Sequence, residues 1–230
     1  ALLLLPIVLL STRTLYMAPR ILWLTFLRTI LHIIGIAAMF ISLQYLPLAD
    51  AIAIAFVMPF IMLLLGRYIL NEEVGMRRLL ACVVGFIGTL LVIQPNFAEV
   101  GAPALLPLLV AVDFALFMLV TRMVAKEVDP ISLQTVSGLM ASAMLVPVLL
   151  IGGTIGWAFF TPVTPVAFDW VLLLMLGTLG TFAHLLMTWS LRFAPSATLA
   201  PMQYLEIPFA TIIGYIVFKD FPNGLALIGI

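Results

Sequence analysis

Long apolar runs separated by short polar turns dominate this chain. With a window of about 19 residues, seven of these runs are long enough to cross a hydrocarbon core of about 30 Å. They lie at residues 21–45, 51–70, 79–93, 104–124, 131–151, 170–191 and 198–218, with partial runs at 1–10 and 222–230. No ten-residue stretch alternates as a membrane β-strand does, so each run is predicted to be a helix. The predicted fold class is all-α integral membrane.

The pattern that starts at residue 42 within the stretch 42–88 recurs 148 positions later, where residues 190–230 align with it without a gap. Aligned pairs include Pro47 with Pro195, Gly66 with Gly214, and Glu72 with Asp220. Each copy reads as a proline turn, an apolar span of about 20 residues, an acidic turn and a second apolar span. The chain is predicted to cross the membrane an odd number of times between the copies, which inverts the second copy. Inverted repeats are typical of secondary carriers, whose substrate site lies near the midplane.

Basic residues divide unequally between the two sets of turns. One set holds Arg13, Arg20, Arg67, Arg77, Arg78, Arg122, Lys126 and Arg192, and the opposite set holds Lys219. The second side also carries Asp50, Glu99, Asp169 and Asp220, with Trp157 and Trp170, while Trp23 and Trp189 lie near the first. By the positive-inside rule the first set is cytoplasmic. We therefore expect a multi-pass protein of the inner (plasma) membrane, with the lipid bilayer as a partner.

Composition agrees with this prediction. Hydrophobic residues make up 65% of the chain and charged residues 9%, and the mean hydropathy is +1.30. A soluble domain contains about 25% charged residues, so this chain could not cover a water-facing surface. Its net charge of +0 gives no reason to expect a nucleic-acid partner. The single Cys82 excludes an internal disulfide or a cysteine metal cluster, and we expect neither metal nor cofactor.

Short motifs in a fixed order resemble a known family. The first copy contains Tyr45-Leu-Pro47-Leu-Ala49-Asp50-Ala51, then Pro59, Glu72–Glu73 and Gly85-Phe-Ile-Gly88 before Gln94-Pro95. The second contains Ala194-Pro195-Ser196, Ala200-Pro201, Tyr204-Leu-Glu206 and Asp220-Phe-Pro222. In order, spacing and duplication these resemble the two EamA domains of the drug/metabolite transporter superfamily. The family's common Gly-Glu at the helix ends is replaced by Asn71-Glu72 and Lys219-Asp220, which weakens the transfer of any role to these turns.

The resemblance implies a ten-helix carrier built from two inverted-topology five-helix repeats. Residues 1–96 would form the first EamA repeat, lacking its first helix and part of its second. Residues 101–230 would form the second repeat, lacking most of its last helix. The chain starts without Met, inside an apolar run, and stops inside another, so we expect it to be clipped at both ends.

The resemblance also implies alternating access to a central cavity. It favours a secondary-active exporter of amino-acid-like or related polar or amphipathic compounds, acting as a monomer or homodimer. Uptake of a vitamin such as riboflavin, or of another metabolite, is the alternative. An intramembrane enzyme or a channel is less favoured, because the chain has no Gly-x-Ser-x-Gly, His-x-x-x-His or recognisable pore-filter motif. We do not expect an enzyme, and without a Walker motif this chain cannot use ATP alone.

Polar residues inside predicted spans mark candidate sites, because such groups are costly in lipid and usually face the bundle interior. Glu206 is the first candidate for the substrate or proton pathway, with Gln203 and Tyr204 beside it. Pro201 and Pro208 bracket it and Pro59 lies in the matching span, so we expect helix breaks that free carbonyl groups to line a cavity. Glu206 could exchange a proton between the two sides, or bind a substrate amine as a fixed charge.

Four further residues complete the candidate set. Asp113 lies mid-span, and Arg28 shares a helix face with His32. Arg28 could instead extend to the cytoplasmic interface. His32 and His184 could pass or share a proton, or make structural hydrogen bonds. Gly177 and Gly180, on the face of His184, are interpreted as sites of close helix packing.

Overall fold

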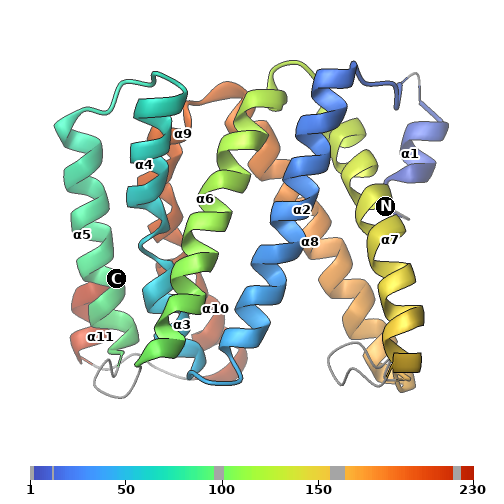
Figure 1. The fold of residues 1–230 in the computed structure, drawn as a ribbon. Coiled ribbons are helices and arrows are strands. Elements are labelled where there is room, and N and C mark those ends of the chain that lie inside the picture. The colour runs from blue at the N-terminus through green and yellow to red at the C-terminus, as the bar shows by residue number, and fades with distance from the viewer. Residues whose placement is uncertain (1–2, 12, 96–100, 156–163, 220–223) are drawn as a thin grey trace. The chain divides into compact units, whose positions relative to one another are not determined.

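The computed structural model describes residues 3–11, 13–95, 101–155, 164–219 and 224–230, and all regular elements in these ranges are helical. They are α1 (Leu5–Leu9), α2 (Pro19–Ser42), α3 (Leu48–Ala55), α4 (Met58–Ile69), α5 (Met76–Ile93), η2 (Ala102–Ala104), α6 (Leu105–Ala125), α7 (Pro130–Ile155), α8 (Ala167–Phe193), α9 (Ser196–Leu199), η4 (Ala200–Leu205), α10 (Glu206–Phe218) and α11 (Gly224–Gly229) (Figure 1). The predicted all-α class is confirmed for the described residues. Glu99, Trp157 and Asp220-Phe-Pro222, which entered the sequence analysis, lie outside them.

Six helical segments of the described chain are long and apolar enough to cross a membrane. They are Pro19–Ser42, Leu48–Ile69, Met76–Ile93, Ala102–Ala125, Pro130–Gly152 and Ala167–Phe193. They match the first six predicted runs. The seventh run, 198–218, is divided among α9, η4 and α10, so it contains no single long helix. The hydrophobic pattern located this run correctly but did not show that it is interrupted.

The chain folds into two compact units. Unit 1 comprises Ala1–Ile30 with Val120–Phe193, and unit 2 comprises Leu31–Leu119 with Ala194–Ile230. Both α2 and α6 therefore contribute residues to each unit. The units differ from the two sequence repeats, because unit 2 contains the most similar part of both copies.

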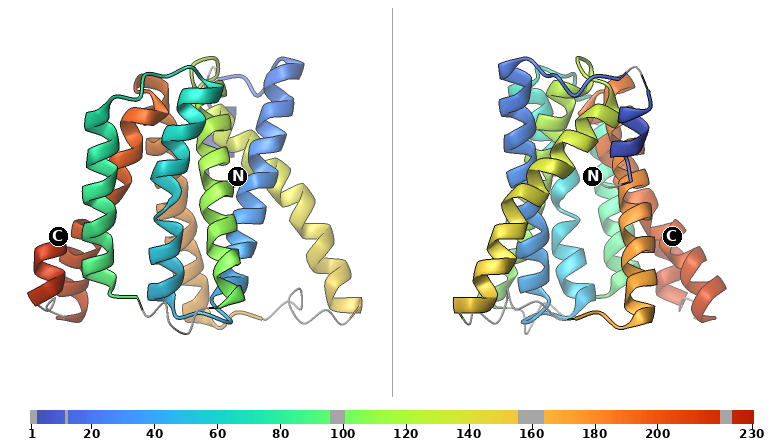
Figure 2. Two further views of the ribbon diagram at one scale, coloured as in Figure 1. Left: turned by 60° about the vertical axis from the view of Figure 1, so that its left-hand side comes forward. Right: turned by 90° about the vertical axis from the view of Figure 1, so that its right-hand side faces the viewer.

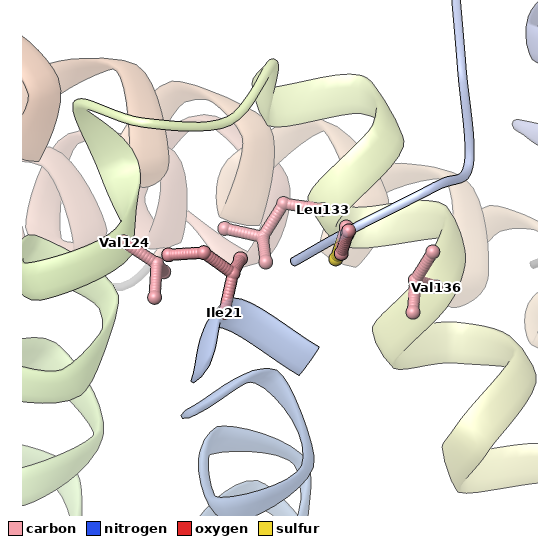
Figure 3. Close-up of a cluster of buried hydrophobic side chains, with 5 residues drawn as sticks. Ile21, Val124, Leu133 and Val136 are labelled. Atoms are coloured by element: carbon pink, nitrogen blue, oxygen red, sulfur yellow. The ribbon is translucent and has the colours of Figure 1, made fainter. Parts of the chain in front are cut away.

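Unit 1 has a hydrophobic cluster formed by the first turn of α2 and the segment just before it, the end of α6 and the start of α7. Its buried members are Met17, Ile21, Val124, Leu133 and Val136 (Figure 3). Two ion pairs lie in the same unit, Arg13 Nε to Asp129 Oδ2 at 3.1 Å and Arg20 Nη1 to Glu127 Oε1 at 2.9 Å. Asp129 Oδ2 also accepts the backbone amides of Ile131 and Ser132, each at 3.1 Å, and so caps α7.

Unit 2 contains both copies of the broken helix. Pro47 and Pro195, which are 148 residues apart, have nearly identical backbone angles (φ −55°, ψ 145° and φ −58°, ψ 147°) and precede α3 and α9. The second helical piece starts at Met58 in one copy and at Glu206 in the other, again equivalent positions. The sequence register is therefore also a structural register, down to the residue at which each helix resumes.

The two copies run in opposite directions within unit 2, α3 to α4 one way and α9 to α10 the other (Figure 1). Phe56 and Tyr204, which the repeat makes equivalent, touch each other. Their rings stack with centroids 5.7 Å apart at 23°, and Tyr204 Oη donates to the Phe56 carbonyl at 2.9 Å. In the same unit, α11 packs beside α5 (Figure 2), where Gly88 and Gly229 permit close backbone contact.

Candidate functional site

A cavity of about 340 Å³ lies in unit 2 at the break in both copies of the helix. It is lined by Met39, Ile52, Ala55, Phe56, Met58, Val110, Ala111, Phe114, Gln203 and Glu206. Ala55 and Gln203 are equivalent in the repeat, as are Met58 and Glu206. The second copy thus supplies polar side chains where the first supplies apolar ones. The volume falls in the range of small-molecule sites, about 300–1,000 Å³.

The break in the first copy has a local cause. Pro59 has no amide hydrogen to donate to the carbonyl of Ala55, so the helix cannot continue through it. The amide of Phe60 bonds the carbonyl of Val57 at 3.1 Å instead of that of Phe56. The Phe56 carbonyl is therefore available to the hydroxyl of Tyr204. The helix is interrupted between Ala55 and Met58, and the other copy satisfies a carbonyl that this break frees.

The break in the second copy is longer. Pro201 stands in the first turn of η4, which spans six residues with the tighter 3-10 geometry. Pro208 follows in the first turn of α10 and has no amide for the carbonyl of Tyr204. Gln203 and Glu206 occupy the end of η4 and the start of α10. Both prolines thus act at the break that exposes these two side chains to the cavity.

Electrostatics at the cavity are dominated by Glu206, the one ionisable side chain among its lining residues in the described chain. The carboxyl end of α3 and the amino end of α4 meet at the first break, and their partial charges, about half an elementary charge each and opposite in sign, largely cancel. The full charge of an ionised Glu206 outweighs what remains. The cavity is thus negative when Glu206 is ionised and neutral when it is protonated.

Tyr204, the neighbour predicted to share this site, lies against other residues. Its hydroxyl bonds Phe56, and its ring packs against Gly85 of α5. A Cβ built on Gly85 would lie 2.6 Å from Tyr204 Cγ and 2.9 Å from its Cβ. Only a glycine admits the ring at this distance. Tyr204 therefore links the two broken helices to α5 and is absent from the cavity lining.

Asp113 and His32 lie between α2 and α6 in unit 2. Asp113 is 5% exposed, and its carboxylate packs so closely on Gly35 that a Cβ there would overlap it. The ring of His32 stacks on Phe117 with centroids 5.2 Å apart. Neither residue lines the cavity, although Ala111 and Phe114 on either side of Asp113 do.

Arg28 belongs to unit 1 and is 2% exposed. Its Nε donates to Thr121 Oγ1 at 2.9 Å, its Nη1 to Ser137 Oγ at 2.8 Å and its Nη2 to Gln134 Oε1 at 3.1 Å. The guanidinium thus joins α2 to α6 and α7. The alternative that Arg28 extends to the membrane interface is wrong, because polar side chains from two other helices surround its donors.

His184 is half-buried on α8 in unit 1, and its carbonyl accepts Thr188 Oγ1 at 2.8 Å. A Cβ at Gly177 or Gly180 would meet no atom within 4 Å in the described structure. The interpretation of these two glycines as close packing sites is therefore wrong for this unit. The described residues also contain no group of three His, Cys, Asp or Glu side chains able to hold a metal ion.

The model of the EamA-like transporter family matches residues 1–94 and 102–230. The chain belongs to this family. The resemblance drawn from the duplicated motifs is thereby confirmed. Several membrane-spanning helices agree with a multi-pass membrane protein.

Curated relatives of this EamA-like chain have different stated substrates and directions. The S-adenosylmethionine uptake transporter of Rickettsia prowazekii is 26% identical over 86% of this chain and 64% of its own length. A riboflavin transporter of Brucella anthropi is 27% identical over 88% and 72%. The pseudopaline exporter of Pseudomonas aeruginosa is 24% identical over 88% and 69%. The chain therefore spans less than two thirds of the first of these relatives.

One protein of known crystal structure has the same fold. It superimposes with a TM-score of 0.66 and covers 99% of this chain and 88% of its own, at 18% identity. At this identity the likeness concerns the fold alone.

The EamA-like chain also has a contact between its two copies at a turn to which the sequence analysis transferred no role. Glu72 follows Asn71, whose φ of 53° is the left-handed conformation in which the family commonly has glycine. Lys219, the equivalent residue, has φ 59°. Asn tolerates this region, so the turn keeps its shape without glycine. Glu72 then reaches Ser196 and Ala197 of the other copy. The sequence repeat drew attention to Glu72, but which residues it contacts is decided by the tertiary structure.

Proposed function

We propose that the protein is a secondary-active carrier of a small metabolite, and that the cavity at the paired helix breaks binds the substrate. The observation that carries this proposal is the position of Glu206 and Gln203 where both copies of the helix are interrupted. Interrupted helices at a repeat interface are the usual substrate and ion site of inverted-repeat carriers. Asp113, His32, His184 and Arg28 stay candidates for the pathway outside the cavity lining.

The architecture we propose is a ten-helix carrier with two inverted five-helix repeats, residues 1–96 and 101–230 of this chain belonging to the first and second. Two observations support it. The equivalent broken helices run in opposite directions (Figure 1), and the equivalent Phe56 and Tyr204 touch each other. Rocking of the halves about such a contact would expose the cavity to each side in turn. We place the protein in the inner membrane, with Arg67, Arg77 and Arg78 on the cytoplasmic side.

Export of an amino-acid-like or related amphipathic compound is the direction and class we favour. An ionised Glu206 attracts an ammonium or sulfonium group, while Met39, Met58 and Phe114 accept an apolar part. S-adenosylmethionine, the named substrate of one relative, carries such cations. A second candidate is riboflavin uptake, favoured by the aromatic rings of Phe56 and Phe114, on which a flat ring system could stack.

Substrate transport would be coupled to proton transport because the substrate cation and a proton compete for one carboxyl group. Glu206 can hold a proton or a substrate cation, but not both, so binding one releases the other. Exchange through alternating access would then move substrate outward as protons move inward. For one proton per substrate, a pH difference of one unit supports up to about a tenfold concentration ratio.

Reconstitution of the full-length protein into liposomes tests this function. Radiolabelled S-adenosylmethionine and riboflavin serve as probes, with and without a pH gradient. The wild type should concentrate a cationic probe under the gradient. Glu206→Gln keeps the shape and loses both the titratable group and the charge that attracts the cation. Accumulation should therefore fall to equilibrium, while exchange without a gradient persists with a higher KM for the cationic probe, because the apolar lining remains. Glu73→Gln, on an exposed turn residue, is the matched control and should behave as wild type.

The outcomes separate the two roles of Glu206. If the Gln variant still concentrates substrate on a proton gradient, Glu206 is not the coupling group. If gradient-free exchange of the cationic probe is also lost, substrate binding or support of the fold is its role. Ohmic current or chemical conversion of the probe in place of saturable exchange would contradict the carrier proposal itself.

A further inference from the structure

We propose that Glu72 is a positioning residue, which fixes the start of the second broken helix and thereby the places of Gln203 and Glu206 in the cavity. Its carboxylate belongs to the turn between α4 and α5 and is not part of the cavity lining. Its role in transport rests on the proposed function. Its effect on the geometry of the cavity does not, and can be measured separately.

Glu72 makes a three-donor contact with the amino end of α9. Its Oε1 accepts the backbone amide of Ser196 at 3.1 Å, and its Oε2 accepts the Ser196 hydroxyl at 2.7 Å and the Ala197 amide at 2.8 Å. Ser196 is 2% exposed and Ala197 is fully buried. The residue before them is Pro195, which offers no side-chain cap. Glu72 thus satisfies buried amides that the local sequence cannot.

The neighbourhood of this contact is tightly packed. A Cβ built on Gly66 would lie 3.0 Å from Glu72 Oε2 and 3.1 Å from Ser196 Oγ. Glycine at this position therefore leaves space for the carboxylate and the serine. The contact uses groups from three places in the chain, and all of them belong to unit 2.

A short segment with few internal hydrogen bonds connects the Glu72 contact to the cavity. Four residues of α9 and six of η4 separate Pro195 from Glu206. Such pieces have few internal hydrogen bonds and the 3-10 geometry is the poorer one, so outside contacts must fix their position. Hydrogen bonds to groups outside the segment help to do so, from the first two residues of α9 to Glu72 at the start and from Tyr204 to the Phe56 carbonyl near the end. The packing of α9 on α4 and of η4 on α4 and α5 contributes as well. Gln203 and Glu206 flank Tyr204, so release at Glu72 lets them shift.

A carboxylate suits this contact better than an amide. All three partners are donors, and both oxygens of Glu72 accept. In Glu72→Gln one oxygen becomes an NH₂ group, which must face at least one N–H. Ser196→Ala is milder, because it removes the hydroxyl and keeps both backbone amides. Glu73→Gln changes the same charge one residue away and leaves the three bonds intact.

Chemical labelling measures the position of Gln203 without a substrate. Cys82 is the single cysteine, so Cys82→Ser followed by Gln203→Cys gives one thiol at the cavity. Its reaction with a cationic methanethiosulfonate is followed in liposomes. Glu72→Gln should change the rate at least about fivefold, the equivalent of one hydrogen bond of about 1 kcal/mol, and Ser196→Ala at least about twofold. Glu73→Gln should leave it unchanged.

Hydrogen exchange supplies the second measurement. In Glu72→Gln the amides of Ser196 and Ala197 should exchange about tenfold faster, while α6 stays as in the wild type. Faster exchange with an unchanged labelling rate would overturn the proposal and leave Glu72 as a local cap. If Glu72→Gln does not fold, Ser196→Ala decides the question. An unchanged rate of thiol labelling in Ser196→Ala would then contradict the proposal. If the wild type does not transport the probes at all, the proposed function is contradicted but the role of Glu72 is not. Thiol labelling and amide hydrogen exchange can both be measured without transport.

Discussion

Substitution of Gly85 by alanine sets two opposing effects against each other. Alanine is a better helix former than glycine, by about 0.8–1.0 kcal/mol in a helix interior. Yet the added Cβ would lie 2.6 Å from Tyr204 Cγ, where carbon atoms in contact need about 3.5–4.0 Å. One of the two groups must move by about 1 Å.

Overpacking should win at this position, because the tyrosine ring is held on both sides. Its hydroxyl bonds the Phe56 carbonyl at 2.9 Å and its ring stacks on that of Phe56. Overpacking a well-packed site costs about 1–3 kcal/mol. Because the ring is held, the upper half of this range, about 2–3 kcal/mol, applies here. After subtraction of the helix-propensity gain, Gly85→Ala should destabilise the protein by about 1–2 kcal/mol.

Thermal unfolding in detergent, followed by the monodisperse fraction on size exclusion, measures this effect. For a chain of this size the midpoint should fall by about 2–8 °C. Gly177→Ala is the matched control, because a Cβ there meets no atom of the described residues within 4 Å. Its propensity gain is unopposed, so its midpoint should stay constant or rise by up to about 4 °C.

Removal of the ring tests the cause. In a Tyr204→Ala background the clash is absent, so Gly85→Ala should no longer destabilise and the two substitutions should be strongly non-additive. Gly85→Ala as stable as the wild type, or equally destabilising in both backgrounds, would refute the reasoning.

Three further substitutions test other contacts by unfolding in detergent or SDS titration. Tyr204→Phe keeps the ring and removes the bond to Phe56, and should cost about 0.6–1 kcal/mol; a cost above that of Tyr204→Ala would contradict this role. Arg28→Lys leaves one ammonium for three acceptors and should cost about 1–3 kcal/mol, whereas an unchanged midpoint would mean that the guanidinium contacts contribute nothing. Lys219→Gly relieves the strain of a positive φ and should stabilise the protein by about 0.5–1 kcal/mol. Asn71→Gly should stabilise it less, because Asn tolerates this conformation better than Lys does. The reverse order would refute the strain argument.

Sequence reasoning reached the helices and the register of the repeat, because both depend on local composition. Apolar length located the spans, and Pro59, Pro201 and Pro208 indicated where the helices are interrupted. It did not show that residues 200–205 adopt 3-10 geometry, since that depends on how η4 packs against α4 and α5. The register also contained the pair Phe56 and Tyr204, but nothing in the sequence showed that they touch.

The misjudged residues are those whose partners come from distant helices. Arg28 lies near the end of its predicted span, which suggests an exposed head group, but Thr121, Gln134 and Ser137 converge on it. Gly177 and Gly180 looked like packing sites by spacing alone. The partners of Glu72 lie more than a hundred residues away along the chain. Such contacts are decided by tertiary packing, which spacing within one helix does not encode.

The bond between Tyr204 and Phe56 has a consequence for how a duplicated chain can change. A twofold dimer of a single half would place the same amino acid on both sides of its axis, so equivalent positions would meet as two phenols or as two plain rings. Here one hydroxyl meets one carbonyl. Joining both halves in one polypeptide lets a substitution arise on one side without its counterpart on the other. The cavity beside this bond has the same freedom, since Glu206 faces a site whose other half contributes Met58.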